Sequence, residues 1–357
     1  MSGVRYRMPI EGAKHDCTWM AFPAGGYVLG ESQDSQYEAL RAWSAVANAI
    51  VCFEPVRMLV DSAMMAIARQ WLSPAIQLYE TPLDDCWLRD SGPTFVHSVD
   101  GIASGVAAVD WTFNGWGAQS WARWSKDSKV AEHVGRISQT PVIHSRLVLE
   151  GGGFHVDGQG TAILTETVPL DPHRNPAATK ADIEQELYQV LGVEKVVWLP
   201  RGLTRDYETF GTRGHVDILA TMPAPGVVLV HEQRDRNHPD YQVSQRTISL
   251  LEQARDARGR QLTVIPVPAP TAGYDAAGPN DYSYINHYVL NGAVMACAFD
   301  DPMDENAWDV LSQAYPGRKV VPLHAKPLFQ RGGGIHCITQ QQPSACADAV
   351  MSNGVLK

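Results

Sequence analysis

The sequence predicts an α/β protein in which five strand–strand–helix–strand units close into a ring around a central channel. Two observations lead to this prediction. The same order of elements recurs along the chain, and His155, His215 and His336 are separated by 60 and 121 residues, close to one and two repeat lengths. Two doubly wound α/β halves would also alternate strands with helices, but they would not explain a fivefold order.

The first unit lacks its own first strand. An apolar strand is expected at 18–24, a helix over 36–54 and a further strand at 55–61. The missing strand can come from the C-terminal segment GGGIHCITQQQP, residues 332–343, which has no helix after it. This pairing would close the ring and leave no exposed sheet edge.

The second and third units follow the same order. The second has predicted strands at 87–99, 101–111 and 141–145 and a helix over 120–137. In the third unit, residues 149–166 form a hairpin around Asp157–Gly158. Apolar residues at helical spacing then predict a helix over 181–192, which Gly192 is placed to end, and a β-branched strand follows at 195–200.

Two further units complete the series. The fourth has strands at 214–222, 226–232 and 261–268 and a helix over 241–259. The fifth has a hairpin over 283–300, a helix over 304–317 and a strand at 319–325. The Pro- and Gly-rich stretches between units have the length of loops rather than linkers. We therefore expect residues 1–357 to form a single domain.

Composition limits the kinds of partner. The chain has 357 residues, of which 45% are hydrophobic and 19% charged, and its formal net charge is -10. An acidic protein is poorly suited to nucleic acid or anionic membranes and better suited to a cationic substrate. No apolar run approaches the roughly 18 residues of a membrane span. We expect a small-molecule partner, no nucleic acid and no membrane, and we leave a homo-oligomer open.

The six cysteines favour a reducing compartment. No two of them form a CxxC pair, so zinc-finger spacing is absent. A chain of this length has enough core to be stable without disulfides. Scattered unpaired cysteines are typical of cytoplasmic proteins, and we expect a cytoplasmic location.

The segment at 332–343 places Cys337 just after three glycines. Glycines allow a backbone to approach a ligand closely, so the turn can present a nucleophilic thiol. A lone cysteine is more often a small buried apolar residue, and the motif taken by itself favours that interpretation.

Other motifs carry acids and a histidine. His215 and Asp217 are two residues apart, so on a strand both would face the channel, although they also suit a satisfied structural pair. Asp90 precedes a Ser-Gly-Pro turn that it can cap, and the adjacent Arg89 would point to the opposite face. The ring would gather a larger set of polar residues: Asp90, Glu150, His215, Asp217, Asn286 and Cys337.

A metal site is the main competing interpretation. His155 and Asp157, together with His215 and Asp217, are residue types that bind metals. No HExxH helix or cysteine cluster accompanies them. We therefore expect no metal at this site.

Six motifs in order carry a family resemblance. WLRDSGPTF, FNGWG, LEGGGFHVDGQGT, GHVD, SYIN and GGGIHCITQQQP resemble the agmatine deiminases and bacterial-type peptidyl-arginine deiminases. The similarity extends from MPIEGAKHDCTWMAFP to QQQP and so covers nearly the whole chain. It implies the pentein fold of the guanidine-modifying superfamily, a fivefold pseudosymmetric α/β-propeller of five ββαβ units around a central channel.

The resemblance also implies roles for the residues. Cys337 matches the nucleophile, His215 the general acid/base and Glu150 the carboxylate that orients that histidine. The residues that match or suit the substrate site are Asp90, Asp217, Trp87, Trp116 and Asn286. Paired carboxylates suit a planar guanidinium, and aromatic rings add cation–π attraction. The implied reaction converts a guanidinium to a ureido group and ammonia through a Cys-linked thiouronium, without a cofactor.

Two departures leave the substrate open. Arg213 stands where the agmatine-type pattern has asparagine; it can pair with Glu208 or Asp206, or face a substrate carboxylate. The segment AGGYVLGES, residues 24–32, lacks the expected tryptophan- and charge-rich stretch. Agmatine, which would give N-carbamoylputrescine, is the first substrate expected. Peptidyl-arginine, another small guanidino compound, an amidinotransferase, a metal-dependent hydrolase and a catalytically silent binding protein remain alternatives.

Overall fold

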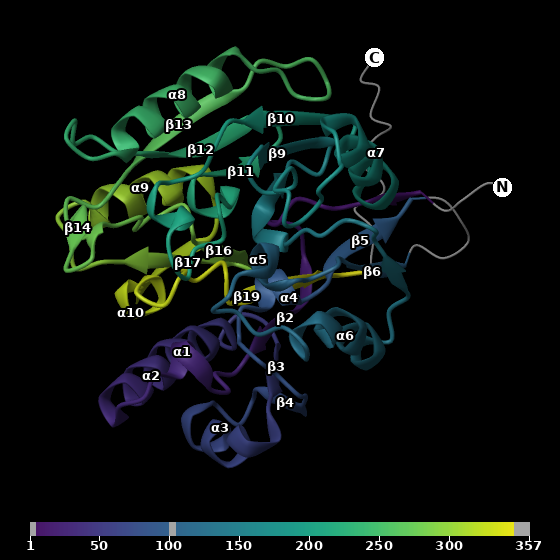
Figure 1. The fold of residues 1–357 in the computed structure, drawn as a ribbon, viewed down its shortest axis with the longest axis vertical. Helices are drawn as coiled ribbons and strands as arrows, with labels where there is room; N and C mark the ends of the chain where they lie inside the picture. The colour runs from purple at the N-terminus through teal and green to yellow at the C-terminus, as the bar shows by residue number, and fades with distance from the viewer. Residues whose placement is uncertain (1–4, 100–104, 346–357) are drawn as a thin grey trace.

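The structure is a computed structural model that describes residues 5–99 and 105–345. Strands and helices alternate along these residues and form a mixed α/β fold, as the sequence predicts. The longer helices lie on the outside of the molecule and the strands lie inside them (Figure 1). These outer helices are α2 (Gln33–Ile50), α6 (Val130–Ser138), α7 (Lys180–Leu191), α8 (Asp240–Gln253) and α9 (Asp304–Ala314).

Five sheets share one internal order, in which an antiparallel pair of strands is followed by a strand parallel to the second. Two of them are β19 (Thr339–Pro343)–β2 (His15–Ala21)–β3 (Val56–Val60) and β5 (Thr94–Ser98)–β6 (Val106–Asp110)–β7 (Val142–His144). The others are β8 (Phe154–Val156)–β9 (Thr161–Thr165)–β10 (Lys195–Leu199), β11 (Ala220–Ala224)–β12 (Val227–Glu232)–β13 (Thr263–Pro268) and β16 (Tyr288–Leu290)–β17 (Ala293–Ala298)–β18 (Lys319–His324). This pairing matches the strand order predicted within each unit.

The C-terminal segment supplies the first strand of the first unit, as predicted. β19 pairs antiparallel with β2, with Gln341 opposite Thr18. The indole N–H of Trp19 donates to Gln342 Oε1 at 2.8 Å, which adds a side-chain bond to the ladder. The two ends of the described chain are therefore joined in one sheet.

Several short elements were not predicted. They are β1 (Tyr6–Arg7), α1 (Gly26–Leu29), α3 (Met65–Trp71), β4 (Gln77–Glu80), α5 (Gly115–Ala118), β14 (Tyr274–Asp275), β15 (Gly278–Pro279) and α10 (Lys326–Phe329). Elements this short carry too few residues for a periodic pattern to be read. β1 and β4 extend two of the sheets by one edge strand each.

Helix boundaries agree best where caps are present. α7 begins at a capping box formed by Thr179 and Asp182 and ends at Gly192, whose φ is 68°. The predicted helix over 120–137 is too long, since α6 begins only at Val130 and the tryptophans before it pack as a loop. Of the predicted strand at 101–111, residues 101–104 lie outside the described part of the chain.

The motif residues precede the strands instead of lying on them, which corrects the sequence analysis. Arg89 and Asp90 belong to the one-turn helix α4 (Leu88–Ser91), and Asp217 lies in a 3₁₀ turn at Val216–Ile218. A positive φ at Arg213 and at Gly214 breaks the extended backbone before His215. The prediction that these residues alternate between the two faces of a strand was therefore wrong. Arg89, Asp90, His215 and Asp217 are nevertheless all buried.

The histidine spacing was also a poor guide to the repeat. His155 lies inside β8, whereas His215 precedes β11 by five positions and His336 precedes β19 by three. The three residues do not occupy equivalent places. Strand pairing, rather than this spacing, carries the repeat.

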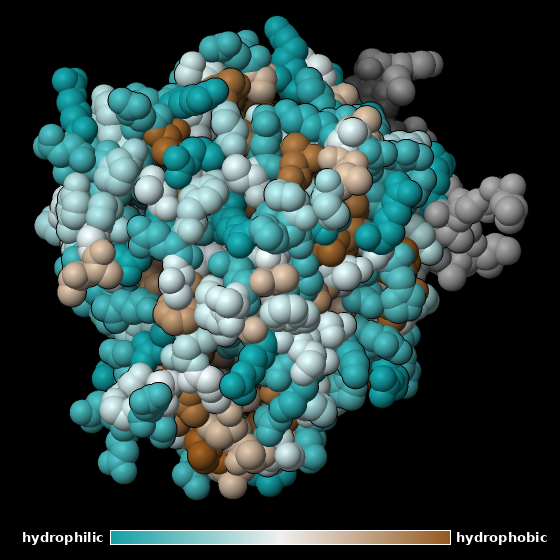
Figure 2. Space-filling model, in the orientation of Figure 1, coloured by the Kyte–Doolittle hydropathy of each residue, from teal (hydrophilic) through white to brown (hydrophobic). Residues whose placement is uncertain are grey.

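The core fills the space between the sheets and the outer helices. Its largest fully buried side chains include Trp19, Trp43, Tyr284, Tyr288 and Phe154. On the face shown in Figure 2, apolar side chains appear as small separate groups among hydrophilic ones. None of the helices in the described ranges combines the length and apolar character needed to cross a bilayer. The five cysteines within those ranges are free, and Cys346 lies outside them.

Candidate active site

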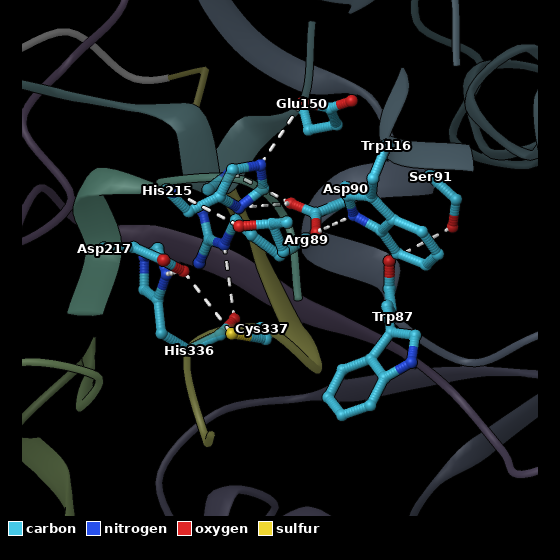
Figure 3. Close-up of polar contacts among 12 residues, drawn as sticks. Trp87, Arg89, Asp90, Ser91, Trp116, Glu150, His215, Asp217, His336 and Cys337 are labelled. Atoms are coloured by element: carbon cyan, nitrogen blue, oxygen red, sulfur yellow. Dashed lines mark hydrogen bonds and ion pairs between the residues drawn. The ribbon is translucent and has the colours of Figure 1, made fainter. Parts of the chain in front are cut away.

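Turns at the starts of β5, β8, β11 and β19 bring a thiol, an imidazole and acidic side chains together (Figure 3). A Cβ atom added to Gly152 would lie 2.5 Å from His215 Nδ1 and 3.0 Å from an oxygen of both Asp90 and Asp217. The sulfur of Cys337 lies 3.5 Å from Asp217 Oδ2. The residues predicted to meet are therefore neighbours, and glycine at position 152 leaves the space between them open.

Cys337 is 7% exposed, and hydrogen-bond donors surround its sulfur. Asn286 Nδ2 lies 3.3 Å from Sγ and the backbone N–H of Gly334 lies 3.4 Å from it. Burial and the charges of Asp217 and Asp90 nevertheless raise the pKa of the thiol well above its usual value. The thiol is thus neutral in the free site.

His215 is held by a carboxylate on one side only. Its Nε2 lies 3.2 Å from Glu150 Oε2, while its Nδ1 is buried without a hydrogen-bond partner and lies 3.8 Å from Asp90 Oδ1. Burial opposes the charged imidazole, but Asp90, Glu150 and Asp217 outweigh it and raise the pKa of His215 to about 9. The ring is an imidazolium near neutral pH, with one N–H free for a ligand.

Glu150 is fixed by an arginine that the sequence analysis missed. Arg174 Nε lies 2.9 and 3.1 Å from the two oxygens of Glu150, and neither side chain is exposed to solvent. Burial alone would raise the pKa of Glu150, but Arg174 and His215 lower it. Arg174 also donates to the carbonyl of Thr212 at 2.7 Å, which ties Glu150 to the loop that carries His215.

Asp90 is held by neutral donors. Trp116 Nε1 donates to Oδ2 at 2.8 Å, and the N–H of Gly152 donates to Oδ1 at 3.0 Å. Burial raises the pKa of Asp90 to about 6, with Asp217 and Glu150 adding to the effect and His215 opposing it. A cation bound at Asp90 would relieve this desolvation.

Asp217 is charged and has one oxygen unused. His336 Nδ1 lies 2.9 Å from Oδ2, whereas Oδ1 is buried without a partner. Burial raises the pKa of Asp217, but His336 and His215 lower it below its usual value. A buried carboxylate oxygen without a donor suits a ligand that brings N–H groups.

Asn286 lies behind the sulfur. Its amide donates to Cys337 Sγ and to the carbonyl of Asp217 at 3.2 Å, and its Oδ1 accepts the N–H of His336 at 3.1 Å. It is fully buried, and these three bonds orient the cysteine turn.

Aromatic side chains cover the site. Trp87 lies against the cysteine turn, because a Cβ on Gly333 would be 2.8 Å from its ring and 2.9 Å from Cys337 Sγ. Trp87 Nε1 donates to the hydroxyl of Tyr27 at 2.7 Å. The Tyr27 ring stacks on Phe210 at 4.4 Å, and Trp121 stacks on Trp116 at 5.3 Å.

Arg213 pairs with a residue that was not predicted. Its Nη1 donates to Asp171 Oδ2 at 2.9 Å, not to Glu208 or Asp206, and its side chain is 31% exposed. Asp206 instead binds the backbone N–H groups of residues 212, 214 and 215. Asp171 also accepts from Arg174, so Arg213 ends a series of alternating charges that begins at His215.

The metal hypothesis finds little support in the geometry. Asp157 accepts the N–H groups of Gln159 and Thr161 and so shapes the hairpin turn. His155 lies near Glu11 and His336, with ligand atoms within 4.8 Å of one another. The guanidinium of Arg89 lies 3.4 Å from Glu11, and its positive charge already balances that carboxylate. A divalent cation there would be repelled.

The residues missed by the sequence analysis are Glu11, Arg174, Asp171, His336 and Tyr27. HRNP around Arg174 and PIEG around Glu11 contain no pattern with chemical meaning of its own. His336 stands next to Cys337 and was available as a signal, but the fold alone reveals its partners.

Known proteins are similar to this chain in sequence and fold. A sequence model of the Porphyromonas-type peptidyl-arginine deiminase family matches residues 7–343. A Streptomyces avermitilis protein that is named provisionally as an agmatine deiminase is 51% identical to this chain over 340 residues. The match covers 95% of this chain and 97% of that protein. An agmatine deiminase of Stutzerimonas stutzeri is 38% identical over 366 residues, with 95% and 96% covered. The solved agmatine deiminase of Enterococcus faecalis has a TM-score of 0.89 at 33% identity, with 97% and 99% covered.

The mixed α/β fold and a site with one thiol, one imidazole and several carboxylates define a class, that of the deiminases. Within this class, the chain belongs to the Porphyromonas-type peptidyl-arginine deiminase family, whose model matches it from residue 7 to residue 343. The resemblance stated from the sequence motifs is thereby confirmed.

Proposed function

We propose that this protein is an agmatine deiminase that converts the guanidinium of agmatine to a ureido group, giving N-carbamoylputrescine and ammonia. One observation carries the proposal: Cys337 Sγ lies 3.5 Å from Asp217, and Asp217, Asp90 and His215 meet around Gly152. The agmatine deiminases among the relatives support this choice of substrate.

Asp90 and Asp217 are the proposed binding groups for the guanidinium. A guanidinium is planar and presents paired N–H donors, which suit two carboxylates. Asp217 Oδ2 faces the space at Gly152 and can accept an N–H from the substrate. The ring of Trp116 lies beside Asp90 and the ring of Trp87 lies beside the cysteine turn, and both can add cation–π attraction.

Substrate binding would also activate the nucleophile. In the free site, burial and two carboxylates hold Cys337 as a thiol. A bound guanidinium offsets the carboxylate charges and joins the positive charge that the His215 imidazolium already carries. Both charges lower the pKa of the thiol, so when the substrate is present the thiol releases its proton to solvent and the thiolate forms.

In the first half-reaction, the thiolate attacks the guanidinium carbon and forms a C–S bond. The Nδ1–H of His215, which faces Gly152, passes its proton to the departing nitrogen. The C–N bond breaks, ammonia leaves, and a Cys337-linked thiouronium remains. Dividing the reaction this way replaces one difficult step with two easier ones.

In the second half-reaction, a water molecule adds to the same carbon. His215, now neutral, takes a proton from that water and becomes an imidazolium again. The tetrahedral species collapses and the C–S bond breaks, and the departing sulfur takes the remaining proton of the added water. The ureido product leaves with its carbonyl oxygen taken from water, and Cys337 is a thiol again. Glu150 would stabilise the imidazolium at Nε2 throughout. No step requires a metal or an organic cofactor.

A small substrate is favoured over a peptide. The five proposed catalytic and acidic residues are at most 7% exposed. The rings of Tyr27, Phe210 and Trp121 pack against one another beside Trp87 and Trp116. A peptide would need a wider opening. Another small guanidino compound is the second candidate, because Arg213 is partly exposed near the loop that carries Trp116.

We also infer that residues 1–357 form a single domain and that the five sheets are arranged as a fivefold propeller around a central channel. The shared strand order supports this arrangement, as do contacts of β8 with β11 and of β5 with β19. A cytoplasmic location and a homo-oligomer remain predictions.

A colorimetric ureido assay across agmatine, free arginine, arginyl peptides and guanidino acids tests the proposed function. Agmatine should give the largest kcat/KM, and Cys337→Ala should abolish product. Cys17→Ala is the matched control, since Cys17 is equally buried but bonds Gln342 instead of a site residue. Product formation by Cys337→Ala would exclude the mechanism.

A further inference from the structure

A second histidine links the site to the N-terminal segment. His336 Nδ1 lies 2.9 Å from Asp217 Oδ2, and its Nε2 lies 2.9 Å from Glu11 Oε1 and 3.2 Å from Oε2 (Figure 3 shows the Asp217 side). All three residues are at most 7% exposed. Both ring nitrogens therefore face carboxylates, and only a doubly protonated ring has an N–H for each of them.

The other groups around His336 do not reverse this charge. Arg89 opposes it, but Arg89 is itself paired with Glu11 at 3.4 Å. The ring of His155 stacks on His336 at 5.1 Å, and burial lowers the pKa of His155 to about 4, so it is neutral. Burial lowers the pKa of the nearby His287 to about 4 as well, so it is also neutral. Burial and Arg89 oppose protonation of His336, but Glu11 and Asp217 outweigh them, and its pKa is raised.

The arrangement makes the two proposed guanidinium-binding acids unequal. Asp90 accepts bonds from neutral donors only, and burial raises its pKa to about 6. Asp217 receives a charge-assisted bond from His336, and its pKa is lowered despite burial. The bond occupies Oδ2 and leaves Oδ1 without a partner. Asp217 is thus the carboxylate that remains charged to lower pH.

We propose that His336 is a positioning residue that stays doubly protonated between Glu11 and Asp217, and that it keeps Asp217 charged, with Oδ2 held toward the space at Gly152 where the substrate cation would bind. This inference rests on the proposed function, because it assumes that Asp217 binds a guanidinium. His336 touches no reacting atom. We expect His336 to affect the affinity of the site for the cation. Glu11 is required because it accepts the second N–H of the His336 ring.

The chain contains a matched control for Glu11. Glu54 is an equally buried acid whose Oε1 lies 3.1 Å from His15 Nδ1. Its other partners are Thr18 and Asn291, which do not belong to the site. Glu11→Gln and Glu54→Gln therefore each remove a buried acid from a histidine, and one of these histidines contacts Asp217.

The first experiment needs no activity. Nitrogen NMR of labelled histidines, with His336 assigned through His336→Gln, should show both ring nitrogens protonated at about pH 7, where an ordinary histidine is mostly neutral, in the wild type and in Glu54→Gln. Glu11→Gln should lose one of these protons, and Glu11→Asp should retain it. A neutral His336 in the wild type would overturn the proposal, even if Glu11→Gln does not fold.

The second experiment measures affinity without chemistry. Calorimetry of agmatine with Cys337→Ala should show binding weakened about tenfold or more when Glu11→Gln is added, because a charge-assisted bond is lost. Glu54→Gln should change the affinity less than about twofold, since surroundings remote from the ligand contribute little. Equal weakening by both substitutions would show a general structural effect and refute the role of His336. If Cys337→Ala binds no agmatine, the proposed function fails, and the NMR result still decides the state of His336.

Discussion

One nitrogen of Arg174 lies within 3.1 Å of both carboxylate oxygens of Glu150, and neither side chain is exposed to solvent. This pair stands directly behind the imidazole of His215. Removing either charge would leave the other buried without a partner, so the pair couples the stability of the protein to its acid/base chemistry.

The first prediction concerns the charge behind His215. Glu150→Gln should lower the pKa of His215 from about 9, because a neutral amide no longer favours the imidazolium. The imidazolium is the form that protonates ammonia, so activity is present below this pKa and is lost as the pH rises through it. The alkaline limb of the kcat/KM profile should move to lower pH, and kcat should fall about 10²-fold or more. An unchanged alkaline limb would show that Glu150 does not raise the pKa of His215.

The second prediction concerns stability. Arg174→Gln removes the buried cation that pairs with both Glu150 and Asp171. It should destabilise the fold by about 3–5 kcal/mol. Urea unfolding followed by circular dichroism measures the change. Arg213→Gln is the control, since its half-exposed guanidinium also binds Asp171 and should contribute about 1 kcal/mol or less. Equal destabilisation by both substitutions would contradict the importance of burial.

The sequence predicted the strand pairing better than it predicted the site. Local turn and helix signals located α7 and its cap at Gly192, and the closing strand β19, because these depend on neighbouring residues. Cys337 and His215 were found because each stands in a distinctive motif. His336 and Glu11 are 325 positions apart, and no local pattern reports that the fold joins them.

The backbone around the motifs was harder to predict. A strand was expected at 214–222, but Asp206 binds several backbone N–H groups and folds the residues before β11 into a turn. Similarly, Trp121 and Trp124 have helix-compatible spacing but pack as a loop, with Trp121 stacked on Trp116. In both places, contacts distant in sequence decide the local conformation.

The third prediction tests whether Trp116 acts through its indole hydrogen bond to Asp90 or through the packing of its ring. Trp116→Phe keeps a ring but removes the N–H that donates to Asp90 at 2.8 Å. KM for agmatine should rise about tenfold, because a buried carboxylate loses a donor and its protonated form becomes more populated. Trp111→Phe is the matched control, since Trp111 is as buried and donates to Thr94 rather than to an acid. If both substitutions raise KM alike, packing rather than the hydrogen bond explains the effect.

The fourth prediction uses the raised pKa of Asp90. Its charged form attracts the guanidinium and predominates above about pH 6, so affinity should be lost as the pH falls through this value. Calorimetry of agmatine with Cys337→Ala measures the affinity without turnover. Asp90→Asn should bind weakly at every pH and show no transition there. A transition that persists in Asp90→Asn would assign the titration to another group.

The fifth prediction addresses the tail of the substrate. Arg213 was expected either to form an ordinary ion pair or to face a substrate carboxylate, and the structure pairs it with Asp171 at 2.9 Å. Because Asp171 already neutralises this guanidinium, a carboxylate on the substrate gains little from it. Free arginine should therefore have a lower kcat/KM than agmatine, and Arg213→Gln should change the ratio by less than about threefold. The competing result is also specific. If Arg213 recognised a carboxylate, wild-type protein would prefer arginine or a guanidino acid, and Arg213→Gln would remove that preference while sparing agmatine.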